Sequence, residues 1–295
     1  MFPKLRKILL ATDGSLYSEG AIREAIHFAR QCSARLTVLF VQETNPEYET
    51  IGVHYFDLET GDAARHLRAI QARASHEGVQ CEAFLHRGDN ASTVIVDEAA
   101  DRSADMIITG RRGRRGLAKL LIGETAAEII SKAPCKVLVV PKAAKIEDGT
   151  ILVATNGSDH SDAAISEAIG IARCRESRII ALSAMRTPEY LDKARSNVRQ
   201  VAALAQEEGL LVESLTPVGK SVDVILETAS GRAADLIVMG APGNKGVTGM
   251  FRGSTAEKVI GQAGCAVLVV RANKEASTRV QPGEKVLETR QAVIV

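Results

Sequence analysis

Tryptophan is absent from this chain of 295 residues, and aromatic residues make up only 3% of it. Proteins that bind single-stranded nucleic acids rely on aromatic side chains on which the bases stack. The formal net charge is only +1, so the charge balance does not indicate a basic surface for nucleic acids or anionic membranes either. The composition therefore favours a small ligand or a protein partner.

Long hydrophobic runs are also absent, since none approaches the roughly 18 residues that a membrane-spanning helix needs. The start of the chain, Met1 to Lys7, has no small-residue cleavage site of a secretory signal. The five cysteines show no CxxC spacing, which indicates reduced thiols rather than a disulfide framework or a zinc site. The six histidines lack tight pair spacing, so surface or packing roles are expected. We therefore expect a cytoplasmic protein without a structural metal.

The chain contains an internal sequence repeat of two copies. Residues 8–30 align with residues 151–173 at a shift of 143, with about 14 of 23 positions identical. Residues 105–141 align with residues 235–271 at a shift of 130, with about 15 of 37 positions identical. Between these blocks the first half carries a long polar stretch, 42–61, whose role as a lid, an oligomer contact or a disordered loop stays open. The repeat predicts two similar domains.

Strands alternate with helices in each half. The strands are apolar throughout, which indicates burial on both faces and a mostly parallel sheet covered by helices. In the first half we expect strands at 7–11, 36–41, 80–85, 106–109 and 137–140, and helices at 18–30, 62–76, 91–101 and 125–131. The predicted fold is α/β, with domains at 1–143 and 149–272 and a tail at 273–295 that adds little core.

Turn residues follow the first and fourth strands of each half. The first strands are followed by residues 12–15 and 155–158, which read TDGS and TNGS. The fourth strands are followed by Gly110, Gly113 and Gly123 in one half, and by Gly240, Gly243, Gly253 and Ser254 in the other. Ligands of such sheets bind beyond the carboxyl ends of the strands. A glycine loop that ends at a helix start exposes backbone N–H groups, which suit phosphate.

Both halves resemble the universal stress protein family, whose nucleotide-binding members carry the motif G-x2-G-x9-G-[S/T]. The second half matches the motif in full, whereas the first half has Glu124 in place of the Ser or Thr. The resemblance implies two tandem open five-stranded sandwiches of strand order 3-2-1-4-5, Rossmann-like and similar to adenine-nucleotide alpha hydrolases. It also implies ATP as ligand, with or without Mg²⁺.

The resemblance assigns the ligand contacts residue by residue. In the second half it places phosphates and ribose on Gly240, Gly243, Gly253, Ser254 and Thr255, and the adenine beside Met185, Val218 and Gly219. In the first half the corresponding candidates are Asp13, Gly110, Gly113 and Gly123. Asp13 matches the family's acid near phosphate or metal. Asn156 stands at that place in the second half and lacks the charge that holds Mg²⁺.

Glu124 is expected to weaken the first site, because a carboxylate repels a polyphosphate where a hydroxyl would donate a hydrogen bond. The neighbouring arginines, Arg111, Arg112, Arg114 and Arg115, offer an offset to that repulsion. A structural interpretation of the same residues stays open. Residues 254–257 form a capping box, and residues 125–128 offer the same signal one position later.

These observations favour a stress-response protein that binds ATP as a regulatory ligand, above all in the second half. One alternative is a nucleotide-free scaffold that acts through protein contacts, and another is a slow ATPase. We predict no catalytic residue, because no activated nucleophile signature occurs. The resemblance also implies that the fifth strands, 137–140 and 267–270, pair within the chain as a pseudo-dimer or between chains in a homodimer.

Overall fold

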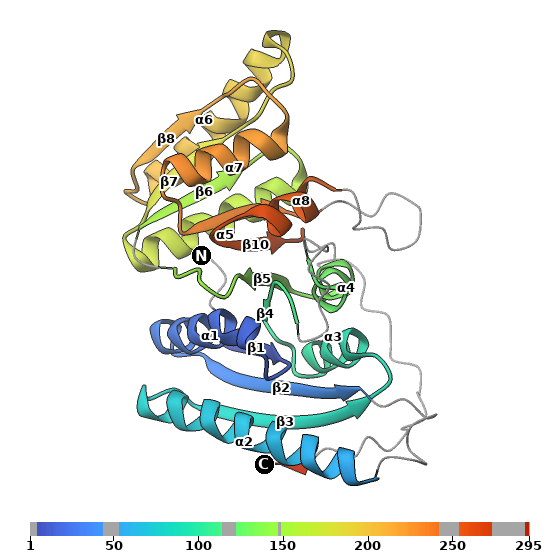
Figure 1. Cartoon of the computed structure of the whole chain (residues 1–295). Helices are drawn as coiled ribbons and strands as arrows, with labels where there is room; N and C mark the ends of the chain where they lie inside the picture. The colour runs from blue at the N-terminus through green and yellow to red at the C-terminus, as the bar shows by residue number, and fades with distance from the viewer. Residues whose placement is uncertain are drawn as a thin grey trace, which may run out of the picture.

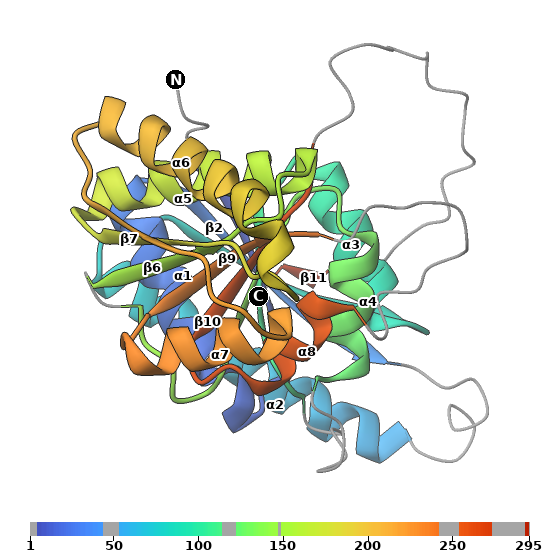
Figure 2. The ribbon, with the colours of Figure 1, turned by 90° about the horizontal axis from the view of Figure 1, so that it is seen from above.

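A computed structural model describes residues 5–43, 53–113, 122–146, 149–241, 254–272 and 293–294. Its two repeated halves lie one above the other in Figure 1, with the first half from blue to green and the second from yellow-green to red. Strands form the middle layer, and helices cover both faces, as the view from above in Figure 2 shows.

The first half alternates strands and helices. Its strands are β1 (Lys7–Thr12), β2 (Arg35–Glu43), β3 (Cys81–Gly88), β4 (Met106–Gly110) and β5 (Lys136–Val140). Its helices are the short η1 (Leu16–Ser18), α1 (Glu19–Cys32), α2 (Val53–His76), α3 (Ala91–Asp101) and α4 (Glu124–Lys132). The periodicity of the sequence located α3 to the residue, and it located most other elements to within one or two residues.

The second half repeats this pattern. Its strands are β6 (Thr150–Ala154), β7 (Arg178–Leu182), β8 (Val212–Leu215), β9 (Leu236–Gly240) and β10 (Ala266–Val270). Its helices are α5 (Asp159–Arg175), η2 (Pro188–Tyr190), α6 (Leu191–Glu207), α7 (Ser221–Gly231) and α8 (Thr255–Gln262). A further strand, β11 (Val293–Ile294), belongs to the C-terminal tail.

All strands of the described residues belong to one sheet of eleven, in the order β11-β3-β2-β1-β4-β5-β10-β9-β6-β7-β8. Read from its outer edge toward the centre, each half has the expected order 3-2-1-4-5, and its neighbouring strands are parallel. The predicted fold class is therefore confirmed. Where the halves meet, β5 and β10 pair antiparallel, with Leu138 opposite Leu268.

The sheet separates two hydrophobic clusters, and both clusters run through both halves. Ile8 and Leu10 of β1 contribute to the cluster under α1, α2, α5 and α6. The alternate residues Leu9 and Ala11 contribute to the cluster under α3, α4, α7 and α8. Successive side chains of a strand point to opposite faces, so a strand covered on both sides must be apolar throughout. The uninterrupted apolar runs of the sequence follow from this arrangement.

A buried ion pair also joins the halves. The Nζ atom of Lys136, at the start of β5, lies 2.8 Å from each carboxylate oxygen of Glu167 in α5. Their side chains are only 10% and 15% exposed. Removal of either partner would leave a charge with little water around it, so the pair fixes the contact between α5 and the central strands.

Two segments differ from the sequence prediction. Helix α2 begins at Val53, whereas its apolar periodicity predicts a start at residue 62, and β2 continues to Glu43. Of the polar stretch 42–61, only residues 44–52 thus lie outside the described residues. In the tail, Val293 and Ile294 pair antiparallel with Leu85 and Phe84 at the edge of β3. No helix in the described part of the chain is long and apolar enough to cross a membrane.

Replacement of Val139 by Lys tests the pairing of β5 with β10. Val139 lies opposite Val267 and is only 1% exposed. An unpaired ammonium there is expected to lower the free energy of unfolding by about 3 kcal/mol or more and to loosen the packing of the halves. Thermal melting and small-angle scattering measure the two effects. Leu211→Lys is the control, because Leu211 is 77% exposed. Unchanged melting and compactness in Val139→Lys would contradict the role of this contact.

Candidate functional site

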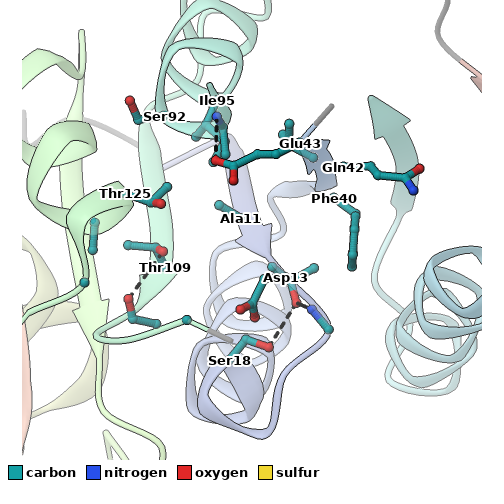
Figure 3. A pocket seen from close by; sticks show the side chains of 18 of the residues that line it. Ala11, Asp13, Ser18, Phe40, Gln42, Glu43, Ser92, Ile95, Thr109 and Thr125 are labelled. Carbon is teal, nitrogen blue, oxygen red and sulfur yellow. Dashed lines mark hydrogen bonds between the residues drawn. The ribbon is translucent and has the colours of Figure 1, made fainter. Parts of the chain in front are cut away.

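A cavity of about 640 Å³ opens at the carboxyl ends of the first half's strands, where β1 and β4 lie side by side and the chain order reverses. Its walls come from the turn after β1, the end of β2, the starts of α3 and α4, and the loop after β4. Figure 3 shows the side chains of this cavity. Its position is the one where open α/β sheets bind their ligands, and its volume is typical of a small-ligand site.

The turn after β1 holds Asp13 at the cavity. Gly14 has a φ of +73°, a conformation that favours glycine, and Gly157 repeats it in the second half with +72°. The turn is closed by a hydrogen bond from the N–H of Ser15 to Oδ1 of Asp13 at 3.0 Å. A Cβ added to Gly113 would lie 2.9 Å from Oδ2 of Asp13. Asp13 therefore faces the glycine loop, as its expected place near phosphate requires.

Asn156 takes the place of Asp13 in the second half, and its side chain is engaged within the turn. Its Oδ1 atom accepts hydrogen bonds from the N–H of Ser158 at 3.2 Å and from the hydroxyl of Ser161 at 2.6 Å. A neutral amide already used in this way offers little to a cation.

The loop after β4 sends its two described arginines in different directions. Arg112 lines the cavity, and its Nε atom is buried without a hydrogen-bond partner in the described ranges. Arg111 instead donates to the carbonyl of Ala263 at 2.7 Å, in the other half. The expectation that Arg111 offsets the charge of Glu124 at the cavity is therefore wrong. Arg114 and Arg115 lie outside the described residues.

Ser254 begins α8 in the second half. Its side-chain oxygen accepts the N–H of Glu257 at 3.1 Å, so the capping interaction predicted by the sequence is present. A hydroxyl that accepts one hydrogen bond still has its own proton to donate. The capping role of Ser254 therefore leaves it able to bind a phosphate oxygen, next to Thr255 in the first turn.

The first half is built differently at the same place. Gly123 is the N-cap of α4 and provides no side-chain cap, and Glu124 is already the first helical residue. The helix thus starts two residues earlier than the box at 125–128 predicts, and Thr125 lies inside the helix instead of capping it. Glu124 lies in the first turn of α4, where the helix dipole favours a negative charge.

The two halves also build different ends for β2 and β7. In the second half Met185 and Val218 form a bridge, and the N–H of Gly219 donates to the carbonyl of Met185 at 2.8 Å. These three predicted adenine neighbours therefore lie together. The first half has Gln42 at the equivalent place, 5% exposed, and in Figure 3 its side chain points away from Asp13.

Carboxylates dominate the cavity of the first half. Among the described residues, its lining contains Asp13, Glu43, Asp62, Glu124 and Glu128, but only Arg112 and His66 as basic groups. Sequence reasoning missed several of these residues, because no motif or spacing marks them. Glu43 accepts the N–H of Ala91 at 3.3 Å, where α3 begins.

Two titratable groups that line the cavity have pKa values shifted from their ordinary ones. Burial lowers the pKa of His66, so the ring is neutral at pH 7, and its Nε2 lies 3.1 Å from the hydroxyl of Thr12. Hydrogen bonds from Ser92 and then from Lys132 lower the pKa of Glu128. Glu128 therefore keeps its negative charge and adds to the acidity of the cavity.

Other predicted contacts are placed only in part. Gly110, Gly113 and Gly123 line the cavity, and Gly240 ends β9. Gly243 and Gly253, which belong to the second half's glycine loop, lie outside the described residues. Across the described ranges no group of three or more His, Cys, Asp or Glu is arranged to hold a metal ion.

The universal stress protein family model matches residues 4–141 and again residues 149–271. The chain belongs to the universal stress protein family. Its two matched segments correspond to the two repeated halves, so it is a tandem member, as the resemblance implies.

The chain is also similar to individual proteins and solved structures. A universal stress protein from Thermus aquaticus is 33% identical over 139 residues, which are 41% of this chain and 98% of the relative. The crystal structure of a universal stress protein from Archaeoglobus fulgidus, at 22% identity, matches with a TM-score of 0.75 over 90% of this chain and 98% of its own. Another solved universal stress protein, 27% identical over 42% of this chain and 98% of its own with a TM-score of 0.38, is described as a complex with cAMP.

Gly240→Ala tests whether the first motif glycine serves packing. A Cβ at Gly240 would lie 2.7 Å from the backbone carbonyl of His160, and one at Gly110 would lie 3.0 Å from that of Tyr17. We expect Gly240→Ala to lower the free energy of unfolding by about 1–3 kcal/mol without any ligand, measured by urea denaturation. Gly123→Ala is the comparison, since its nearest contact would be 3.5 Å. Equal stability of the two variants would contradict the packing role.

Proposed function

We propose that this universal stress protein binds an adenine nucleotide, ATP, as a regulatory ligand in a stress response. The observation that carries the proposal is the start of α8, where Ser254 caps the helix and keeps a proton to donate. The N–H groups of a helix start and the positive end of its dipole favour phosphate. In this proposal Gly240, Gly243, Gly253 and Thr255 complete the phosphate contacts, and the domains are 1–143 and 149–272.

The adenine would lie at the other end of the second half's site. The bridge of Met185 with Val218, and the hydrogen bond from the N–H of Gly219 to the carbonyl of Met185, hold these three residues together after β7. Met185 is 7% exposed, whereas Val218 is 54% exposed and presents apolar surface. An apolar surface beside a few backbone hydrogen-bonding groups suits a purine, whose face is apolar and whose edge carries hydrogen-bonding atoms.

The first half is proposed to bind the same ligand more weakly. Arg112 offers a buried Nε atom without a partner in the described ranges, which fits a phosphate oxygen. The carboxylates of Glu124 and Glu128 weaken binding in this half, because they repel the negatively charged phosphates of the nucleotide. Mg²⁺ is usually held by one or two carboxylates and by phosphates, and Asp13 is the carboxylate that would serve it here.

A nucleotide-free scaffold in the cytoplasm is the second candidate. It is favoured by Glu124, which occupies a helix start with a protein carboxylate, and by Asn156, whose oxygen is used within its own turn. Slow ATP hydrolysis is a weaker third candidate, because the acid and the capping serine lie in different halves. In each of these candidates the two halves, paired through β5 and β10, act as an intrachain pseudo-dimer, and two chains could further form a homodimer.

The decisive measurement is the nucleotide that the purified protein releases on denaturation, identified by chromatography and given per chain. We expect ATP at about one per chain, and loss of it in Gly243→Val, because a branched side chain would block the approach of phosphate to the backbone. Gly113→Val, the matched change in the first half, is expected to keep the bound ATP. Absence of released nucleotide together with absence of ATP binding in calorimetry would contradict the proposal and favour the scaffold.

Glu124→Ser makes the first half's motif like that of the second. The change removes a carboxylate beside the phosphates and supplies a hydroxyl, so we expect ATP affinity in the first half to rise by about tenfold or more. Calorimetry in the Gly243→Val background isolates this site. Glu124→Gln separates the charge effect from the hydroxyl's hydrogen bond. Equal affinities before and after Glu124→Ser would show that the carboxylate does not weaken the first site.

A further inference from the structure

Arg111 belongs structurally to both halves of the chain. Its backbone lies in the loop at the first half's cavity, where its carbonyl accepts the N–H of Gly123 at 2.9 Å. Its side chain leaves that cavity and enters the second half. There Nη1 donates to the carbonyl of Ala263 at 2.7 Å and reaches that of Ile260 at 3.5 Å.

The carbonyls that Arg111 contacts lie at the C-terminal end of α8. The last carbonyls of a helix have no partner within it and carry partial negative charge, so a guanidinium there is stabilising. With eight residues, α8 is only about 12 Å long. Its other end is Ser254, the proposed phosphate contact of the second half. A single short helix therefore spans the distance between Arg111 and the second site.

An arginine from the second half makes the reciprocal contact. Arg271 follows β10 and donates to the carbonyls of Ile130, at 2.7 Å, and Ser131. These carbonyls lie at the C-terminal end of α4, whose N-terminal end lines the first half's cavity. Both arginines are half-buried, and this burial lowers the pKa of each. Each phosphate-facing helix is thus held at its far end by the other half.

We propose that Arg111 is a positioning residue that couples ligand binding at the two sites through α8. The inference rests on the proposed function, because it concerns the same two nucleotide sites. A phosphate bound at Ser254 orders α8, and an ordered α8 holds Arg111 and the loop between Gly110 and Gly113 in place. The second ligand then meets a loop that is already ordered, so the two binding events favour each other.

The absence of tryptophan allows a test that observes the first half alone. Tyr17→Trp introduces a single fluorophore next to Gly110, at a side chain that is 48% exposed. Ser254→Asp blocks the second site, because aspartate keeps the capping acceptor but repels phosphate. In the Tyr17→Trp protein we expect Ser254→Asp to weaken ATP binding at the first half by about fivefold or more.

Arg111→Gln supplies the other side of the double-mutant cycle. With Gln at position 111, Ser254→Asp is expected to have no further effect on the first half's affinity for ATP, because the link is cut. Arg111→Lys keeps a cation and should retain part of the effect. Arg173→Gln is the matched control, since Arg173 is an exposed arginine that pairs with Glu208 at 2.9 Å. It should behave like the unmodified protein.

Several results would overturn the coupling. One is an unchanged first-half affinity in Ser254→Asp with Arg111 present, and another is the same loss with Gln at position 111. Fluorescence that shows no ATP at the first half while calorimetry shows it at the second would also overturn it. Failure of the unmodified chain to bind ATP at all would overturn the proposed function and this inference together, a result recognised before any variant is made.

Hydrogen exchange keeps the inference testable if Arg111→Gln does not fold. In the Ser254→Asp protein, which retains Arg111, ATP has access only to the first half. Binding there is expected to slow amide exchange in the last turn of α8, near Ile260 and Ala263, because a filled cavity holds the loop and its arginine. Unchanged exchange in that turn, with ATP bound, would overturn the coupling.

Discussion

The antiparallel pairing of β5 with β10 is the contact on which the rest of the structure depends. Val137, Leu138 and Val139 lie opposite Val269, Leu268 and Val267, and none of the six is more than 2% exposed. Either strand alone would leave an apolar edge of unpaired backbone groups, which proteins must cover. Because each strand covers the other, the halves share one sheet and two continuous hydrophobic clusters. The ion pair of Lys136 with Glu167 requires this arrangement, and so do the hydrogen bonds that Arg111 and Arg271 donate to the other half.

The repeated halves present the same backbone and different chemistry. In the second half a helix starts behind a serine that can donate to a ligand, beside an asparagine whose oxygen is already used. In the first half the helix starts with a glutamate, and the turn after β1 carries Asp13. Among the described residues that line the first cavity, acidic side chains outnumber basic ones, and their charge acts against a polyphosphate there. The division of these features between halves limits the case for hydrolysis.

The motif glycines serve packing as well as any ligand. Gly110 and Gly240 end equivalent strands, and each lies so close to the backbone of a neighbouring segment that a methyl group would collide with it. Gly113 is different, because the atom it would meet belongs to the side chain of Asp13, which faces the cavity. A match to the motif therefore identifies the fold more firmly than it identifies a ligand, and the helix starts carry the argument for phosphate.

The sequence by itself determined the repeat, the fold class, the strand order through the family resemblance and the capping role of Ser254. The helices, the strands and this cap depend on local periodicity and on residues a few positions apart, such as 254 and 257, so short-range physics suffices for them, whereas the strand order came from the resemblance. The start of α2 was missed because the polar run 59–62, which contains Gly61, interrupts the apolar periodicity of the helix. Only the tertiary structure decided that Arg111 leaves its cavity for Ala263, that Gln42 points away from Asp13, and that His66 lines the site. Those directions depend on partners many residues distant, and nothing in the local sequence encodes which half of the sheet a long side chain will meet.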